Sequence, residues 1–325
     1  MKGSIVSALA DFSPLNHIFI GYSGGVDSHV LLHACATLPE LKSKITAVYI
    51  HHGLQKEADD WAIHCQQIAR NLGVSFLEGR VNAQPNNGES PEEAARNARY
   101  NEFKNLINEN DVLLIAQHRE DQLETVLLQL FRGSGLKGLA GMPEKMPFGK
   151  GHLVRPLLNV GKEMINAYAL EKKLVWIEDP SNQNSIYDRN FLRQEIIPQL
   201  RQRWQSLDKT VTRTATHCAE AEILISKMAQ TEFETVFNAD DETLNIPKLL
   251  TYSPTEQRLI LRQWFEFLGL KMPSQDFVQR ILKEVVGAKN DRHPRLHKKG
   301  VTVCRQKTSL LILRDGLPSD IKHQR

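Results

Sequence analysis

The residues with the clearest chemical potential form a short loop, Ser23-Gly24-Gly25-Val26-Asp27-Ser28, between an apolar run at 18–20 and a helical pattern at 30–34. Two glycines let the backbone turn tightly and approach a ligand. The following helix would direct free N–H groups and the positive end of its dipole at an anion, and two serines add hydroxyl donors. The loop therefore predicts a phosphate site. An ordinary strand-to-helix turn capped by serine and aspartate is the alternative.

A comparison with other glycine-rich motifs narrows the chemistry. The loop contains no lysine, so it is not the G-x-x-x-x-G-K-[ST] loop that reaches terminal phosphates with an ammonium group. The segment 133–138 matches G-x-G-x-x-G, but it follows a helical run at 124–132, whereas a dinucleotide-binding fingerprint follows a strand. We therefore expect a loop after a helix at 133–138, and a Rossmann dehydrogenase is disfavoured.

The elements that must position the loop alternate between strand and helix patterns. Short apolar segments, mostly β-branched, occur at 18–20, 45–50, 74–77, 112–116 and 175–177 and are typical of strands buried on both faces. Amphipathic stretches lie between them, including 60–72 and a helix opened by the capping box Ser90–Glu93. Repeated β-α units predict an α/β fold with a doubly wound parallel sheet, which binds ligands at the carboxyl ends of its strands.

The second half of the chain is mainly helical. We expect a helical tract from 189 to about 230 that breaks at Pro198, then helices at 219–237, 255–268 and 275–286, and a closing hairpin from 301–304 and 310–313. We place a catalytic domain with a helical linker at 1–215. A smaller, mainly helical substrate-binding or tRNA-binding domain that ends in the β-hairpin is expected at 216–325.

Composition excludes several classes. No apolar run approaches the ~18 residues that a membrane span needs, and the first residues lack the apolar core of a signal peptide. The four cysteines Cys35, Cys65, Cys218 and Cys304 form no close pair, which disfavours a disulfide framework and a thiolate metal site. We expect a cytoplasmic protein without a membrane partner. The sequence leaves open whether it is a monomer or a homodimer.

Positive charge gathers in the last part of the chain. The 325 residues include 41 Lys+Arg and 38 Asp+Glu, but positions 283–325 hold 11 Lys+Arg against 4 Asp+Glu. This asymmetry indicates a polyanion partner, with a solvated lysine-rich surface as the alternative.

The loop resembles the S-G-G-x-D-S signature of the N-type ATP pyrophosphatases, the PP-loop family. That resemblance implies ATP as cosubstrate and cleavage between its α and β phosphates. AMP would be transferred to a substrate oxygen and then displaced by a nucleophile. Magnesium ions are the expected cofactor, because they prefer the hard oxygen ligands of carboxylates and phosphates.

Further segments in order along the chain resemble the tRNA(Ile)-lysidine synthetase family over about residues 15–205. They are 47–54, 93–100, 116–125, 155–156, 179–182 and 189–193. The resemblance implies ligation of free lysine to C2 of the wobble cytidine of the isoleucine tRNA with a CAU anticodon. An adenylated tRNA would be the intermediate, and AMP and pyrophosphate the products. Many family members continue into a further C-terminal domain, and we do not expect one within these 325 residues.

The resemblance also assigns site residues. The family pattern H-x-D-D-Q-x-E-T falls on 118–125, with Glu120 at its first acidic position, and the histidine expected just ahead of it is Gln117 here. We expect the loop residues Ser23, Gly24, Gly25, Val26, Asp27 and Ser28 to bind ATP. The expected catalytic residues are Asp27, Asp121 and His118, and the expected Mg²⁺ ligands are Asp27, Asp121 and Glu124. Glu124 as a helix-face carboxylate and Thr125 as a packed methyl group are the alternatives.

Four arginines are candidate contacts for the phosphates of tRNA or of ATP: Arg96, Arg99, Arg189 and Arg193. A guanidinium binds phosphate in a fixed bidentate fork, although arginines three or four apart are also common on a solvated helix face. His51 and His52 fit a structural or adenosine-site role better than a catalytic one. Two other functions remain open at this point: a PP-loop tRNA thiolase or other AMP-forming ligase, and a non-catalytic RNA-binding protein.

Overall fold

The computed structural model describes residues 1–53, 58–82, 84–85, 91–180, 186–289, 292–298 and 300–314. Ser90, Ser181, Asn182 and Lys299, which the sequence motifs include, lie outside these ranges. The chain divides into two compact units, Met1–Ala219 and Glu220–Arg325. In the described part of the chain, no helix is long and apolar enough to cross a membrane.

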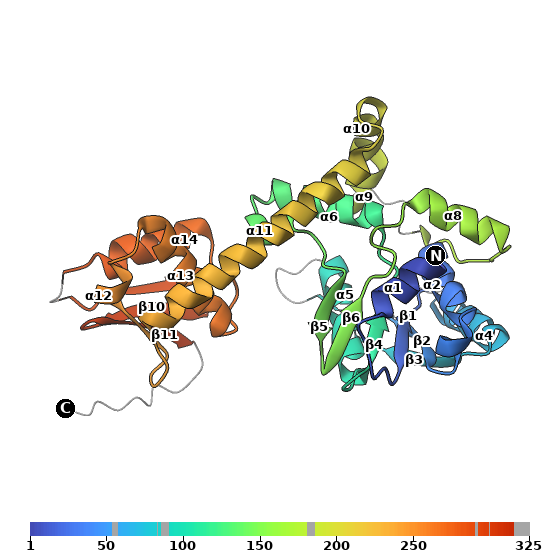
Figure 1. Cartoon of the computed structure of the whole chain (residues 1–325), viewed down its shortest axis with the longest axis horizontal. Coiled ribbons are helices and arrows are strands. Elements are labelled where there is room, and N and C mark those ends of the chain that lie inside the picture. Colours follow the sequence, from blue (N-terminus) through green and yellow to red (C-terminus); the bar gives the residue numbers. More distant parts are fainter. Residues whose placement is uncertain are drawn as a thin grey trace. The chain divides into compact units, whose positions relative to one another are not determined.

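The first unit contains a six-stranded sheet in the order β3-β2-β1-β4-β6-β5, which can be followed from strand to strand in Figure 1. Its strands are β1 (Ile18–Gly21), β2 (Ile45–His51), β3 (Ser75–Arg80), β4 (Val112–Leu114), β5 (Lys145–Phe148) and β6 (Gly151–Val154). All neighbours are parallel except β5, which pairs antiparallel with β6 at the edge. This confirms the expected doubly wound α/β fold.

Helices cover both faces of this sheet because its strands are apolar on both sides. One face packs against α1 (Lys2–Leu9), α2 (Val26–Ala36), α4 (Ala58–Leu72) and α8 (Lys162–Glu171) in a single hydrophobic cluster. The other face packs against α5 (Pro91–Leu106): Phe103 of this helix and Ile107, just after it, share a cluster with Val48 and Leu113. The short helix α3 (Pro39–Lys42) leads into β2.

The strand order reverses between β1 and β4, which are neighbours in the sheet although two further strands separate them along the chain. Ligands of open α/β sheets bind where the order reverses, outside the carboxyl ends of the strands. The segment after β1 is the predicted phosphate loop, and the segment after β4 leads into α6 (Arg119–Phe131). The topology therefore brings the two motifs of the sequence to one edge.

Some local expectations were wrong. The apolar run 175–177 is not a strand: Ile177 instead donates its backbone N–H to the carbonyl oxygen of Gly24, so the segment lies against the phosphate loop. The helical tract does not break at Pro198, which sits in the first turn of α10 (Ile197–Arg203), where a missing N–H costs nothing. The break comes at 204–206.

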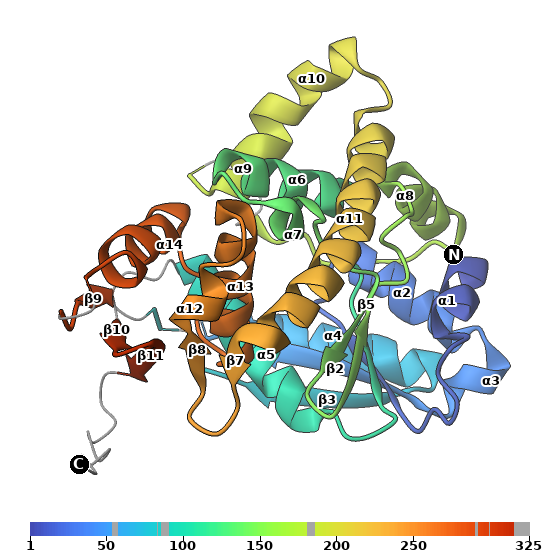
Figure 2. The ribbon, with the colours of Figure 1, turned by 60° about the vertical axis from the view of Figure 1, so that its left-hand side comes forward.

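The remaining helices of the first unit follow α6. The glycine-rich segment 133–138 follows a helix, as expected, but only 133–135 is a loop, because 136–138 belong to α7 (Leu136–Leu139). Later come α9 (Asp188–Phe191), the π-helical turn η2 (Leu192–Ile196) and α10. Figure 2 shows α9 beside α6, and the two helices are in contact. The long helix α11 (Leu207–Val236) spans the boundary between the units.

The second unit combines helices with a five-stranded antiparallel sheet in the order β7-β8-β11-β10-β9. The expected hairpin is present as β10 (Val301–Gln306) and β11 (Ser309–Arg314). The sequence patterns missed β7 (Phe237–Asn238), β8 (Thr243–Asn245) and β9 (Arg295–Lys298), which are short or strongly polar. The helices are α12 (Ile246–Leu249), α13 (Pro254–Phe267) and α14 (Gln275–Arg280), which continues as the π-helical turn η3 (Ile281–Val286).

Candidate active site

The phosphate loop is held by its own serines. The Ser23 and Ser28 hydroxyls lie 3.2 Å apart, and the Ser28 hydroxyl donates to the carbonyl oxygen of Gly25 at 3.0 Å. Gly25 has an extended backbone and forms the N-cap of α2 without a side-chain cap bond. Free N–H groups at the start of this helix are therefore available to an anion, as the sequence predicted.

Gly24 is fixed by the segment that covers it. Its φ is +82°, and a Cβ atom there would lie 2.5 Å from Cδ1 of Ile177 and 3.0 Å from Sγ of Cys65. Gly24→Ala should therefore destabilise the first unit by about 1–3 kcal/mol and weaken nucleotide binding, because the loop or the 175–177 segment must move. Thermal melting with and without ATP measures both effects. Gly25→Ala is the matched control, since its Cβ would meet only Oγ of Ser23, at 3.5 Å; an equal loss of stability in both variants would contradict this explanation.

His118 lies at the centre of three carboxylates. Its Nε2 is 3.6 Å from Oδ1 of Asp27 and 3.4 Å from Oδ2 of Asp121, and its Nδ1 is 3.2 Å from Oε2 of Glu120. The His118 side chain is only 5% exposed. The backbone N–H of His118 also donates to Oδ2 of Asp121 at 2.9 Å, which caps α6. The structure thus brings the three expected catalytic residues together.

These carboxylates set the charge of the ring. Burial alone would lower the pKa of His118, but contacts with Asp27 and Glu120 and the charge of Asp121 raise it to about 9. Burial alone would raise the pKa of Asp27, but His118 and Lys162 together lower it below its usual range. At pH 7 the imidazole is a cation that can donate to a phosphate or carbonyl oxygen, and it cannot serve as a general base.

The raised pKa predicts a pH dependence of stability. A group whose pKa is higher in the folded state stabilises fully below its unfolded pKa and loses that contribution as pH rises through the folded value. His118 should therefore contribute up to about 3 kcal/mol that disappears between pH 7 and pH 10. Urea unfolding of wild type and His118→Gln across this range measures the difference. His17→Gln, whose side chain is 62% exposed, is the control and should retain the wild-type slope; equal slopes in wild type and His118→Gln would contradict the prediction.

Glu120 and Gln117, the two departures from the family pattern, have structural partners. Besides His118, Glu120 accepts the backbone N–H of Lys162 at 2.9 Å and lies 3.4 Å from Arg201. Burial would raise the pKa of Glu120, but His118 and the Lys162 amide lower it to about 2. Gln117 accepts a hydrogen bond from Nε of the buried Arg155 at 2.5 Å. Glu120 therefore orients the His118 ring, and Gln117 anchors a buried guanidinium.

Glu124 is held by arginines. It is 1% exposed, and Arg193 grips it in a bidentate pair, with Nε to Oε1 at 2.6 Å and Nη2 to Oε2 at 2.8 Å. Arg189 lies 3.4 Å from Oε2 of Glu124 and donates to the hydroxyl of Thr125 at 3.0 Å. Arg193 also lies 3.4 Å from Asp121. In this arrangement Glu124 holds Arg189 and Arg193, and both of its oxygens are engaged.

The other candidate arginines lie on α5. The guanidinium carbons of Arg96 and Arg99 lie 5.4 and 5.8 Å from the centre of the Tyr100 ring. Arg99 also faces His52: burial lowers the pKa of His52 to about 4, and the charge of Arg99 adds to this effect. These two arginines therefore surround an aromatic ring of their own helix and the segment after β2.

The neighbouring histidine, His51, contacts residues around the end of β2. His51 lies 3.4 Å from Asp59, and its Nδ1 accepts the backbone N–H of Gly53. These contacts fix the turn at the end of β2, which agrees with a supporting role and gives the ring no part in the group around His118.

The carboxylates around His118 suit a magnesium ion. Asp27 and Asp121 present oxygens toward the same ring nitrogen, at the mouth of the phosphate loop. Among the described residues no three His, Cys, Asp or Glu side chains form a closed metal site. Mg²⁺ usually takes one or two carboxylates and completes its shell with water and substrate phosphates. Asp27 and Asp121 fit this pattern, whereas the engaged oxygens of Glu124 do not offer it a third ligand.

Lys162 is a member of the site that the sequence patterns missed. Its Nζ contacts Oδ1 of Asp27, although 135 residues separate them along the chain. It is the first residue of α8, after the N-cap Gly161, beyond the end of β6. Lys162 could have been found from the sequence only through its position after β6, a buried strand that pairs with β4. The sequence patterns did not predict β6.

Comparison with known proteins agrees with this geometry. The PP-loop domain family matches residues 2–200, and the TilS substrate binding domain matches 244–311. The tRNA(Ile)-lysidine synthase of Proteus mirabilis is 45% identical over 283 residues, and that of Methylococcus capsulatus is 42% identical over 315 residues. These alignments cover 86% and 96% of this chain. The chain belongs to the tRNA(Ile)-lysidine synthase family.

Membership of the tRNA(Ile)-lysidine synthase family confirms the resemblance drawn from the loop and the 116–125 segment. The chain spans 64% and 72% of the lengths of these two relatives. A solved structure, the U34-tRNA thiolase NcsA from Methanococcus maripaludis with its [4Fe-4S] cluster, is 15% identical with a TM-score of 0.55. That alignment covers 67% of this chain and 78% of the thiolase chain, and it supports the PP-loop fold alone.

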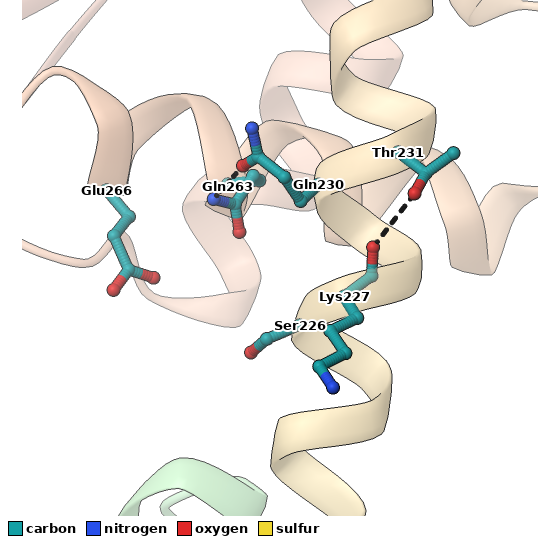
Figure 3. A pocket seen from close by; sticks show the side chains of 6 residues that line it. All are labelled: Ser226, Lys227, Gln230, Thr231, Gln263 and Glu266. Atoms are coloured by element: carbon teal, nitrogen blue, oxygen red, sulfur yellow. Dashed lines mark hydrogen bonds between the residues drawn. The ribbon is translucent and has the colours of Figure 1, made fainter.

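The second unit has a shallow groove of about 470 Å³ between α11 and α13. Figure 3 shows its lining, Ser226, Lys227, Gln230, Thr231, Gln263 and Glu266. Gln263 donates to Gln230 at 2.9 Å, and Thr231 donates to the Lys227 carbonyl oxygen. Gln230 and Gln263 therefore pair with each other, and the charged residues of the lining are Lys227 and Glu266.

Proposed function

We propose that this chain ligates free lysine to C2 of the wobble cytidine in the isoleucine tRNA with a CAU anticodon, using ATP. The observation that carries the proposal is the convergence of Asp27, His118 and Asp121 beside the loop 23–28, in a chain of this family. The C2 oxygen of the cytidine attacks the α-phosphorus of ATP, and pyrophosphate leaves. The lysine amine then attacks C2, and AMP leaves.

The residues divide this chemistry between them. The free N–H groups at the start of α2 hold phosphate oxygens. The charged His118 donates to the α-phosphate or to the C2 oxygen, where negative charge develops. Asp27 and Asp121 would hold Mg²⁺, which supplies charge neutralisation on the phosphates when bound. Arg189 and Arg193 keep Glu124 and Asp121 in place, while Arg96 and Arg99 remain proposed contacts for tRNA phosphates.

A sulfur-transferring function has less support. Cys35 and Cys65 are buried, and burial raises the pKa of each thiol to about 12, which leaves little thiolate. Cys218 and Cys304 lie in or near the second unit and join no cysteine cluster among the residues described. Replacing all four cysteines with serine should leave lysidine formation intact, and loss of activity in a folded variant would favour a thiolase.

The two units divide the substrates. We propose that 1–215 carries the ATP chemistry and that 216–325 binds tRNA, in line with the match to a substrate binding domain. In the second unit, Arg295 and Lys298 are exposed on β9, while Leu296 between them is buried. Lys298 also donates to the hydroxyl of Ser274 at 2.7 Å. The exposed edge of the second sheet is therefore basic where β9 lies.

Neutralising Arg292, Arg295, Lys298 and Lys299 to glutamine should weaken tRNA binding and flatten its salt dependence. Each phosphate contact removed lowers the slope of log K against log salt by about 0.7–0.9. Filter binding over a range of salt concentrations measures this, since lost contacts release fewer counterions. Arg280→Gln is the control, because Arg280 already pairs with Glu284 at 2.7 Å. Unchanged affinity and slope in the fourfold variant would make this segment a solvated surface.

The proposal is tested by labelled lysine. Purified protein should incorporate it into the CAU-anticodon isoleucine tRNA only with ATP and Mg²⁺, and release AMP and pyrophosphate. If ATP binds and no lysine is incorporated, the substrate assignment is wrong. If the chain were a non-catalytic RNA-binding protein, the wild type would show no ATP turnover. The Asp27→Ala and Asp121→Ala variants would then bind tRNA as well as the wild type does.

A further inference from the structure

Lys162 is a cation beside a phosphate loop that contains no lysine of its own. Its Nζ contacts Oδ1 of Asp27, and both side chains are 32% exposed. Asp27 already faces a second cation, since Nε2 of His118 lies 3.6 Å away. The pair is therefore open to an incoming ligand, and Asp27 keeps a charged neighbour if Lys162 leaves.

The position of Lys162 is unfavourable for a purely structural residue. It occupies the first position of α8, a helix of 10 residues, where the dipole disfavours a positive charge. A partly exposed ion pair usually contributes little to folding. A lysine at this position therefore does not stabilise the helix. Its ion pair with Asp27 offsets only a small part of the unfavourable interaction with the helix dipole. The same helix start uses its backbone N–H to hold Glu120, which orients His118.

We propose that Lys162 binds the phosphates of ATP and releases Asp27 when it does so. This inference rests on the proposed ATP chemistry of the same site. The flexible four-carbon stem of a lysine allows its ammonium group to change partners, and lysine binds phosphate as a point charge. When the ammonium group leaves, Oδ1 of Asp27 becomes available for the proposed role of Asp27 as a Mg²⁺ ligand. Lys162 then stabilises the charge on the departing pyrophosphate, which a lysine within the loop does in other phosphate loops.

Binding of inorganic pyrophosphate and of ATP in EDTA tests the proposal without turnover. Four proteins are compared by titration calorimetry: wild type, Lys162→Gln, Asp27→Asn and the double variant. A charge-assisted contact is worth about 1.5–3 kcal/mol, so Lys162→Gln should weaken pyrophosphate binding by about 10- to 100-fold. Asp27→Asn should bind pyrophosphate as tightly as wild type or more tightly, because it frees the lysine and removes a repelling charge.

The double variant separates direct contact from an effect through Asp27. If Lys162 touches phosphate, adding Lys162→Gln to Asp27→Asn should still weaken binding by about tenfold or more. If the double variant binds as Asp27→Asn does, Lys162 only neutralises Asp27 and the proposal is overturned. Lys172→Gln is the control, since Lys172 pairs with Glu171 just after the end of α8 and should retain wild-type affinity.

Failure of this inference is distinguishable from failure of the proposed function. A Lys162-dependent affinity for pyrophosphate together with no lysine incorporation would overturn the substrate assignment and support the role of Lys162. If wild type incorporates lysine but Lys162→Gln binds pyrophosphate with unchanged affinity, the substrate assignment is supported and the role of Lys162 is overturned. Thermal melting of each variant shows whether it is folded. If wild type binds neither pyrophosphate nor ATP, both the role of Lys162 and the proposed function are overturned.

Discussion

Asp121→Asn should reduce lysidine formation by about 10²- to 10³-fold while the protein stays folded, because removing one preorganised electrostatic group from an active site typically costs this much in kcat. Asparagine keeps an oxygen that can accept the backbone N–H of His118, so the cap of α6 is preserved. What it loses is the negative charge that faces Nε2 of His118 at 3.4 Å and Arg193 at the same distance.

The measurement is lysine incorporation under saturating ATP, together with thermal melting. The Tm should change by no more than a few degrees, since the hydrogen bond to the helix start remains. Asp188→Asn is the control, because Asp188 is an exposed carboxylate in the first turn of the neighbouring helix α9. Wild-type activity in a folded Asp121→Asn protein would remove Asp121 from the chemistry.

Glu124→Ala should cause the largest loss of stability, about 3 kcal/mol or more. Glu124 is almost fully buried and satisfies Arg193 at 2.6 and 2.8 Å, while Arg189 lies 3.4 Å away. Removing one partner of a buried pair leaves uncompensated charge and costs about 3–5 kcal/mol, with the lower value expected because Arg193 is 43% exposed. For a unit of this size the Tm should fall by about 6–12 °C.

The matched control is Glu171→Ala, which removes the partner of Lys172 from an exposed pair with a distance of 2.8 Å. Exposed pairs contribute less than about 1 kcal/mol, so the Tm should hardly change. If the Tm of Glu124→Ala equals that of the control and of wild type, the Glu124 carboxylate does not hold the arginines. Retained stability together with a changed Mg²⁺ requirement would instead make Glu124 a metal ligand.

The segments that carry the candidate site could be predicted from the sequence because they follow strands. The loop after β1 and the 118–125 segment after β4 come from neighbouring strands, and parallel sheets collect such segments at one edge. The family resemblance singled out Asp27, His118 and Asp121, and the order of strand and helix patterns indicated that they lie at the same edge of the sheet. The assignment of the 11 positively charged residues at 283–325 to an RNA partner stays a prediction, because only part of that segment is described.

The sequence could not reveal contacts made by segments distant along the chain. Lys162 reaches Asp27 from a helix after β6, a short strand with a polar histidine in it that no pattern marked. The bidentate pair between Glu124 and Arg193 joins residues 69 positions apart. The apolar run 175–177 looked like a strand because its composition is that of a short buried strand. In the structure Val175 is exposed, and Ile177 lies against the phosphate loop.

We propose that this site joins lysine to a cytidine in tRNA. The most direct test supplies labelled lysine and ATP with two isoleucine tRNAs that differ in the first anticodon base, CAU and GAU. We expect ATP-dependent incorporation into the CAU tRNA, with AMP released in equal amount, and none into the GAU tRNA. ATP turnover without lysine in either tRNA, or equal labelling of both, would contradict the claim.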